Sequence, residues 1–410
     1  MGLDTLTRKI IAITLAFAIC GVLVYRTSRL FLGAWITRNG TPDPAIYERA
    51  IRYDPRNADY HFVLAQIYNY STQYLNPSRA GEEYETAVRL NPDRAAHWLE
   101  LSKYYEQTGN VERCRYSMQM ALQKDPNYAQ THWAAANLYM RMNDIKIADF
   151  ELRRTADLDV SYLMQVLDLV WRFYQDPQKI MSTHIPNTKD ANRIALDYFI
   201  ARKNEEGASL AWNRLKIFDT KPEERFGYIN YLVSVHKPHE AWDVFTSGPD
   251  RAEGLLYNGS FETEPLNGGF DWRFSSTEDS EARRDPTVSK DGRDSFMVAF
   301  DGKENVNYAH LWHWLPVHKG RSYKLTFWMK TEGITTNEGM FVEVDGKSSE
   351  KQGGSTGWQQ FAIPFMATSD LVVVRLRRVP SKKFDNLLAG KVWLDAFGLA
   401  EIPKTAKILE

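Results

Sequence analysis

The sequence predicts a multidomain chain in which an N-terminal transmembrane helix is followed by an all-α solenoid and then by an all-β sandwich. Three observations carry this prediction: an uncharged run over residues 10–25, an Ala-to-Pro motif that recurs along the first half, and short alternating apolar runs after residue 254. At 410 residues the chain is long enough for two or three domains. We expect an anchor and linker over residues 1–40, the solenoid over 41–247 and the sandwich over 254–402.

Composition excludes several classes of protein. Lys and Arg number 51 against 52 Asp and Glu, and with a net charge of −1 neither half of the chain has the basic excess typical of a nucleic-acid-binding protein. The two cysteines, Cys20 in the apolar run and Cys114 in the helical region, form neither a disulfide framework nor a zinc site. The unusual feature is the aromatic content of 13%, with 12 Trp and 21 Tyr.

The uncharged run from Ile10 to Tyr25 is preceded by Arg8 and Lys9 and followed by Arg26, which is typical of a membrane segment with interfacial cations. As a helix it rises about 24 Å, against a hydrocarbon core of about 30 Å. A secretory signal is the alternative, but its Ala-x-Ala at 16–18 lies inside the run and leaves too short an apolar region. We therefore expect an uncleaved single-pass anchor through residues 10–25, with its sidedness open because both flanks are basic.

An internal repeat organises residues 41–160. Its copies end at Pro55, Pro92 and Pro126, each preceded by Asp or Asn and, five residues before the Pro, by Ala. The unit Trp98, Leu101, Tyr105, Gly109, Cys114, Met118, Ala121, Pro126 resembles the 34-residue tetratricopeptide pattern. A fourth unit follows over 129–159, and residues 196–218 and 228–245 are interpreted as degenerate helical hairpins that cap the stack.

Such a solenoid binds its partners on a concave side, built from first-helix positions that packing does not use. The resemblance therefore implies a protein partner. The positions expected to contact it are Gln66, Asn69, Lys103, Glu106, Trp133, Asn137 and Met140. Their mixed charge does not match the Lys and Asn pattern that clamps an acidic peptide terminus.

After residue 254, alternating runs separated by Gly, Asn, Asp and Ser predict an antiparallel sandwich or jelly roll. Tyr323, Leu325, Phe327 and Met329 are expected to face its core, so Trp328 must face the other way. We expect Trp328 to share an outer surface with Glu343, Gln360, Arg375 and Arg377, where the ring and the two guanidinium groups suit an acidic glycan.

A second candidate surface lies in the aromatic run at residues 308–314. Alternation places Tyr308, His310, Trp312 and Trp314 on one face, which is either a sugar-stacking platform or part of the core. Both alternatives stay open from the sequence.

The motifs Leu255–Glu262 (LLYNGSFE), Tyr323–Thr331 (YKLTFWMKT) and Val392–Leu399 (VWLDAFGL) resemble the family 4/9/22 carbohydrate-binding modules. The resemblance implies a jelly-roll domain that binds a glycan. It also implies a structural calcium ion held by Glu262 and Asp395, with a capped turn and a surface ion pair as the alternative.

No catalytic motif stands out. Glu343-Val-Asp345-Gly-Lys347 approaches the carboxylate pattern of a retaining glycosidase, but Lys347 replaces the third carboxylate. We expect a non-catalytic, membrane-anchored bacterial envelope protein of the inner membrane, with its soluble part in the periplasm, acting in polysaccharide assembly or export. The alternatives are a pure protein scaffold with a structural jelly-roll cap and, more remotely, a glycoside hydrolase.

Overall fold

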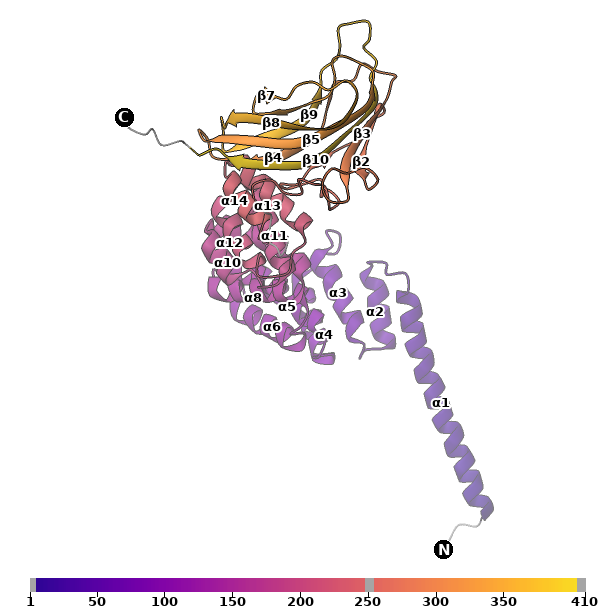
Figure 1. Cartoon of the computed structure of the whole chain (residues 1–410). Coiled ribbons are helices and arrows are strands. Elements are labelled where there is room, and N and C mark those ends of the chain that lie inside the picture. The colour runs from indigo at the N-terminus through magenta and orange to yellow at the C-terminus, as the bar shows by residue number, and fades with distance from the viewer. Residues whose placement is uncertain (1–4, 248–253, 404–410) are drawn as a thin grey trace. The chain divides into compact units, whose positions relative to one another are not determined.

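The computed structural model describes residues 5–247 and 254–403 (Figure 1). It divides into two compact units, Met1–Pro186 and Asn187–Glu410. The expected fold class is confirmed: a long apolar N-terminal helix, a helical repeat region and an antiparallel sandwich follow one another along the chain. Most of the expected boundary at 247–254 lies outside the described residues.

Residues 5–247 fold into helices that follow one another along the chain. They are α1 (Thr5–Thr37), α2 (Pro44–Tyr53), α3 (Ala58–Tyr70), α4 (Pro77–Leu90), α5 (Ala95–Gln107), α6 (Val111–Lys124), α7 (Ala129–Arg141), α8 (Ile145–Leu158), the short 3-10 helix η1 (Val160–Tyr162), α9 (Leu163–Tyr174), α10 (Pro177–Thr183), α11 (Lys189–Ala201), α12 (Glu205–Leu215), α13 (Pro222–Ser234) and α14 (Pro238–Phe245). The last four correspond to the two degenerate hairpins that the sequence predicted.

The repeat motif determines where these helices begin and end. Asn76 and Asn110 cap the starts of α4 and α6 by accepting backbone N–H bonds from Arg79 and Arg113. At the other end, the Asp or Asn before each closing proline terminates α2, α4 and α6, because a residue that precedes proline disfavours the helical conformation.

One hydrogen bond recurs from repeat to repeat. The side-chain ring N–H groups of His61, Trp98 and His132 donate to the carbonyl oxygens of the prolines six residues earlier, at 3.2, 2.8 and 3.0 Å. His61 and His132 thus occupy the position of the aromatic residue that opens the repeat. Their second ring nitrogens bind Glu83 and Glu151.

Helix α1 is the one helix, among the residues that the structure describes, that is long and apolar enough to cross a membrane. Its C-terminal end belongs to the first unit's core. Gly33 is buried, and a Cβ at that position would lie 3.2 Å from the Tyr60 hydroxyl oxygen. Ile36, one turn further on, packs against the same core.

The C-terminal region forms two five-stranded antiparallel sheets, drawn as arrows in Figure 1. Sheet A has the strand order β1-β4-β9-β6-β7 and sheet B the order β2-β3-β10-β5-β8. The strands are β1 (Arg273–Phe274), β2 (Ser280–Asp285), β3 (Ser295–Asp301), β4 (Tyr308–Pro316), β5 (Ser322–Ile334), β6 (Phe341–Val344), β7 (Lys347–Ser348), β8 (Gly354–Met366), β9 (Leu371–Arg378) and β10 (Ala389–Glu401).

The sandwich core lies where alternation predicted it. Tyr323, Leu325, Phe327 and Met329 are fully buried on β5, while Trp328 between them is half-buried. Helix α14 packs against the segment that precedes β1. The rings of Trp242 and Phe245 contact the Phe270 ring at centroid distances of 5.3 and 5.9 Å.

Candidate functional site

The outer face of sheet A carries a row of polar and aromatic side chains that crosses four strands. Arg273 on β1 pairs with Trp312 on β4, Trp312 pairs with Arg375 on β9, and Arg375 pairs with Glu343 on β6. Leu311 and His313, on either side of Trp312, are fully buried, so Trp312 points away from the core. Directly opposed residues on one face lie within contact distance, which makes the row a continuous surface.

Two guanidinium groups in this row, and a third beside it on Arg377, give the surface a positive character. The Arg273 guanidinium lies 4.6 Å from the ring centroid of Trp312 and 3.8 Å from that of Trp314. Burial lowers the pKa of Arg273 from its usual value without discharging it. Arg377 lies 3.8 Å from Glu343. Arg375 is exposed and forms no ion pair within the described residues, so its donors are available to a ligand.

The expectation that Tyr308, His310, Trp312 and Trp314 share one face of their strand is wrong for Tyr308. Tyr308 is fully buried and packs edge-on against Phe300 at 5.3 Å. The cause is a register shift between Tyr308 and Leu311, which reverses the alternation within β4. His310 is exposed, and Trp312 and Trp314 are half-buried on the outer face.

The predicted surface that joins Trp328 to Glu343, Gln360, Arg375 and Arg377 is also wrong. Trp328 lies in sheet B, between Asp395 on β10 and Gln360 on β8. Glu343, Arg375 and Arg377 lie in sheet A. Alternation correctly predicted that each of these side chains points outward. It does not say, however, which of the two sheets a strand joins. The structure therefore divides the set into Trp328 with Gln360, and Glu343 with the two arginines.

Trp328 has a cationic neighbour of its own. The Lys290 ammonium lies 4.2 Å from the centroid of the Trp328 ring. This contact covers part of the ring that the sequence assigned to a sugar.

Glu262 and Asp395, the two expected calcium ligands, hold the same loop. Glu262 Oε1 accepts backbone N–H bonds from Arg293 and Asp294, at 2.8 and 3.1 Å. Asp395 Oδ2 accepts them from Lys290 and Asp291, at 2.6 and 2.9 Å. Burial raises the pKa of Asp395, and the backbone N–H groups oppose this.

This geometry fits calcium only in part. The four N–H donors use one oxygen of each carboxylate, whereas calcium takes six to eight oxygen ligands. Asp395 Oδ1 also accepts a backbone N–H bond, from Ala396 at 2.6 Å. Glu262 Oε2 is thus the carboxylate oxygen of the pair that accepts no hydrogen bond within the described residues. Within the described residues, the group of three side chains close enough to share a metal lies elsewhere, at His239, His318 and Asp370.

That second group joins α14 to two loops of the sandwich. The His239 and His318 rings stack at a centroid distance of 4.3 Å, and His239 Nε2 lies 3.9 Å from Asp370 Oδ1. Asp370 Oδ1 also accepts a backbone N–H bond from Lys319 at 2.9 Å. The sequence did not single out these residues, because they lie far apart along the chain.

In the helical repeats, three of the predicted partner-binding residues line one hollow of about 290 Å³. Lys103 comes from α5, and Trp133 and Asn137 come from α7, one turn apart. The Trp133 ring lies 6.0 Å from that of Tyr162. An apolar ring beside an amide and an ammonium group suits a peptide side chain entering from solvent.

The other predicted residues of this surface have different environments. Glu106 forms a bidentate ion pair with Arg141, at 2.5 and 2.8 Å, and Arg141 also lines the hollow. Gln66, Asn69 and Met140 are half-buried on α3 and α7. The Asn69 amide nitrogen is buried without a hydrogen-bond partner in the described part of the chain.

The tetratricopeptide repeat family matches residues 75–129, which contain α4, α5 and α6. A sequence search of curated proteins gives no match.

Among solved structures, MamA is 14% identical, covering 45% of this chain and 91% of its own, with a TM-score of 0.28. A CBM4 structure is 15% identical, covering 36% of this chain and 99% of its own, with a TM-score of 0.26. TmCBM61, solved in complex with β-1,4-galactotriose, is 13% identical, covering 37% and 100%, with a TM-score of 0.27. These similarities assign no ligand to this chain. The chain contains tetratricopeptide repeats, followed by an antiparallel β-sandwich.

Proposed function

We propose that this chain is a non-catalytic scaffold anchored in a membrane, which binds a protein through its helical repeats and an anionic glycan through its sandwich. The observation that carries the glycan half is the row of Arg273, Trp312, Arg375 and Glu343 across sheet A. An aromatic ring offers its face to sugar C–H groups, and an adjacent free guanidinium binds a carboxylate or sulfate.

The proposal that the chain is anchored in a membrane rests on α1. Its apolar part leads without interruption into a segment that packs on the first repeat through Gly33 and Ile36. Cleavage near residue 18, as for a secretory signal, would leave these residues on a shortened helix. An uncleaved anchor keeps the span and the first repeat in one element. We place the chain in a bacterial inner membrane as a single-pass protein, with the repeats and the sandwich in the periplasm.

The proposal that the helical repeats bind a protein rests on the hollow between α5 and α7. Trp133 supplies an apolar contact there, and Lys103 and Asn137 also line it. Lys103 already donates to Glu100 and Asn137 to the Trp133 carbonyl oxygen, and each has further N–H groups for a ligand. Together with an anionic glycan on the sandwich, this arrangement suits a scaffold in polysaccharide assembly or export, where one protein must meet both an enzyme and its polymer.

A hydrolase is not favoured, because the two nearest carboxylates do not form a pair. Glu343 lies on β6 and faces outward beside Arg375 and Arg377. Asp345 lies in the following turn, where both its oxygens accept hydrogen bonds from Thr368, at 2.8 and 2.6 Å. Two free carboxyl groups flanking one glycosidic bond are what that chemistry requires.

Calcium at Glu262 and Asp395 stays part of this proposal. The ion would use Glu262 Oε2 and would share Asp395 Oδ1 with the Ala396 N–H group. It would add a second link between the first and last segments of the sandwich and the loop at 290–294. It would act as a structural cofactor, away from the row on sheet A.

A glycan array probed with the detergent-solubilised full chain tests the proposal. We expect binding to acidic polysaccharide fragments, lost in Trp312→Ala and kept in Trp328→Ala, the matched control on the opposite sheet. Loss in Trp328→Ala alone would move the site to sheet B. Absence of binding by the wild-type chain would favour the alternative, a protein scaffold whose sandwich is a structural cap.

A further inference from the structure

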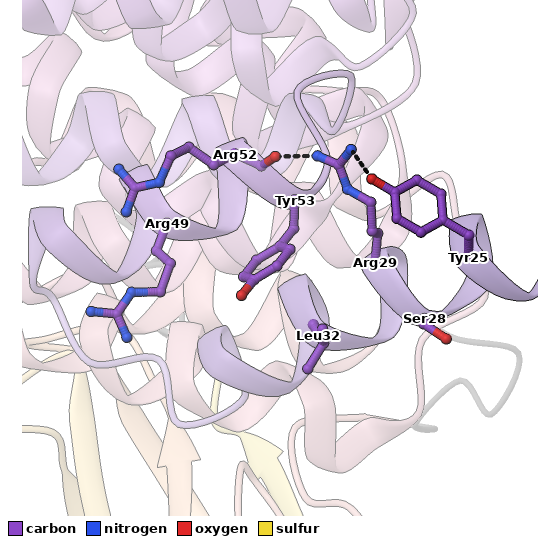
Figure 2. A pocket seen from close by; sticks show the side chains of 7 residues that line it. All are labelled: Tyr25, Ser28, Arg29, Leu32, Arg49, Arg52 and Tyr53. Carbon is purple, nitrogen blue, oxygen red and sulfur yellow. Dashed lines mark hydrogen bonds between the residues drawn. The ribbon is translucent and has the colours of Figure 1, made fainter.

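A basic hollow lies where α1 leaves the apolar run. Its volume is about 650 Å³, and α1 and α2 contribute its lining residues: Tyr25, Ser28, Arg29, Leu32, Arg49, Arg52 and Tyr53. Figure 2 shows Arg29 rising from α1 toward α2, which carries Arg49, Arg52 and Tyr53. These residues are i, i+3, i+4 and i+7 on α1, and i, i+3 and i+4 on α2, so each set shares one helix face.

The position of the hollow along α1 corresponds to the headgroup layer. Tyr25 is the last residue of the uncharged run, and Leu32 follows it after two turns, a rise of about 10 Å. The polar layer on each side of a bilayer is about 5–7 Å thick. If Tyr25 lies at the hydrocarbon boundary, as interfacial tyrosines do, then Arg29 lies at the depth of the lipid phosphates.

Among the described residues, the positive charge in the hollow is compensated only by a through-space attraction between Arg52 and Glu48. No carboxylate lines it in the part of the chain that the structure describes, and Arg29, Arg49 and Arg52 form no ion pair there. The neighbouring Glu48 is already engaged by the Tyr68 hydroxyl at 2.8 Å and by Arg79 at 2.9 Å. Three arginines that form no ion pair attract an anion strongly in an interfacial setting.

One of the three arginines is held in place. Arg29 donates to the backbone carbonyl oxygen of Arg52 and lies 3.4 Å from the Tyr25 hydroxyl. Its guanidinium is thus fixed between the two helices, with donors left over for a ligand. Arg49 and Arg52 are exposed, so their side chains are free to close on that ligand.

We propose that this hollow binds the phosphate of an anionic phospholipid headgroup and so fixes the first repeat against the membrane surface. The occupant is a lipid because the hollow begins where the apolar span ends. A net anionic headgroup fits better than a zwitterionic one, because a choline cation would approach three guanidinium groups. This inference rests on α1 crossing the membrane, which is part of the proposed function.

Native mass spectrometry of the full chain, released from detergent with equal amounts of phosphatidylglycerol and phosphatidylcholine, tests the inference. We expect the wild type to retain phosphatidylglycerol on the order of tenfold better. Arg49→Gln with Arg52→Gln should abolish the preference. The control pair, Arg26→Gln with Arg38→Gln, removes the same charge from exposed positions on α1 and just after it that do not line the hollow, and should keep it.

Three outcomes would overturn the inference. Equal retention of both lipids by the wild type means that the hollow does not select charge. An equal loss in both double variants means that general surface charge is responsible. Displacement of phosphatidylglycerol by an equal concentration of inorganic phosphate assigns the hollow to a soluble anion. Alkaline carbonate extraction checks the anchor separately: release of the chain from membranes refutes the span itself, whatever the lipid preference.

Discussion

Trp312 and Arg375 lie directly opposite each other on β4 and β9, and both point away from the core of the sandwich. The pair stands in the middle of the row on sheet A, with Arg273 beyond the tryptophan and Glu343 beyond the arginine. Because Arg375 has no acidic partner within the described residues, a ligand that meets the Trp312 ring also meets a free guanidinium.

Removing that guanidinium should weaken binding of acidic glycans. For Arg375→Gln we expect about tenfold weaker binding of an acidic fragment, since a charge-assisted bond is worth roughly 1.5–3 kcal/mol. The change should also flatten the salt dependence of binding. Titration calorimetry at two salt concentrations measures both effects.

Lys324→Gln is the matched control, because Lys324 is exposed on β5 in the opposite sheet. It should bind like the wild type. An unchanged affinity in Arg375→Gln, or an equal loss in both variants, would remove Arg375 from the binding surface.

A second prediction concerns the contacts between successive repeats. The Tyr105 hydroxyl donates to Glu85 at 2.6 Å, and Arg113 binds the same carboxylate at 3.0 Å. Tyr105→Phe should lower the free energy of unfolding by about 1 kcal/mol, because Glu85 loses a partner. Tyr116→Phe is the control, since Tyr116 is exposed and its hydroxyl has no hydrogen bond in the described part of the chain. Urea unfolding followed by circular dichroism compares them, and equal losses would contradict the assigned role.

The third prediction concerns pH. Burial lowers the pKa of His313 to about 4, below its value of about 6.5 in an unfolded chain. Between pH 6.5 and 4 the unfolded state therefore binds a proton at this histidine that the folded state does not bind. The free energy of unfolding consequently falls as the pH drops from 6.5 toward 4. At about pH 4, His313 alone lowers the free energy of unfolding by roughly 3 kcal/mol.

His313→Phe should remove this contribution. Burial also lowers the pKa of His97 and His184, so the useful quantity is the difference between variant and wild type at each pH. Calorimetry at pH 7 and pH 5 should show the variant losing less stability than the wild type over that interval. Parallel losses would mean that His313 is protonated without cost.

Calcium provides the fourth prediction. If Glu262 and Asp395 hold the ion, 1 mM calcium should raise the melting temperature of the sandwich by about 3 °C or more over a chelated sample. Glu262→Gln should lose this increment and still fold, while Glu264→Gln, at an exposed neighbouring position, should keep it. Identical melting curves with calcium and with chelator, after exhaustive chelation, would mean that backbone N–H groups and not an ion hold the two carboxylates.

Much of the architecture follows from local patterns in the sequence. The repeats could be predicted from the sequence because their prolines, caps and aromatic positions recur at a nearly fixed interval, and because each helical hairpin packs mainly on its neighbours. The inward face of β5 could be predicted for a similar reason, since successive side chains along any strand point to opposite faces of its sheet. Trp328 accordingly points outward, as predicted.

The composition of the candidate surface was decided only by the tertiary structure. Trp328 and Arg375 have the same outward phase, yet the order of strands puts them in different sheets. Tyr308 and Trp312 have the same parity, yet a register shift buries one and leaves the other on the surface. The row from Arg273 to Glu343 and the hollow between α1 and α2 likewise join residues that are distant along the chain. Alternation and periodicity report on neighbours within one element, whereas strand order, bulges and helix docking depend on contacts between elements.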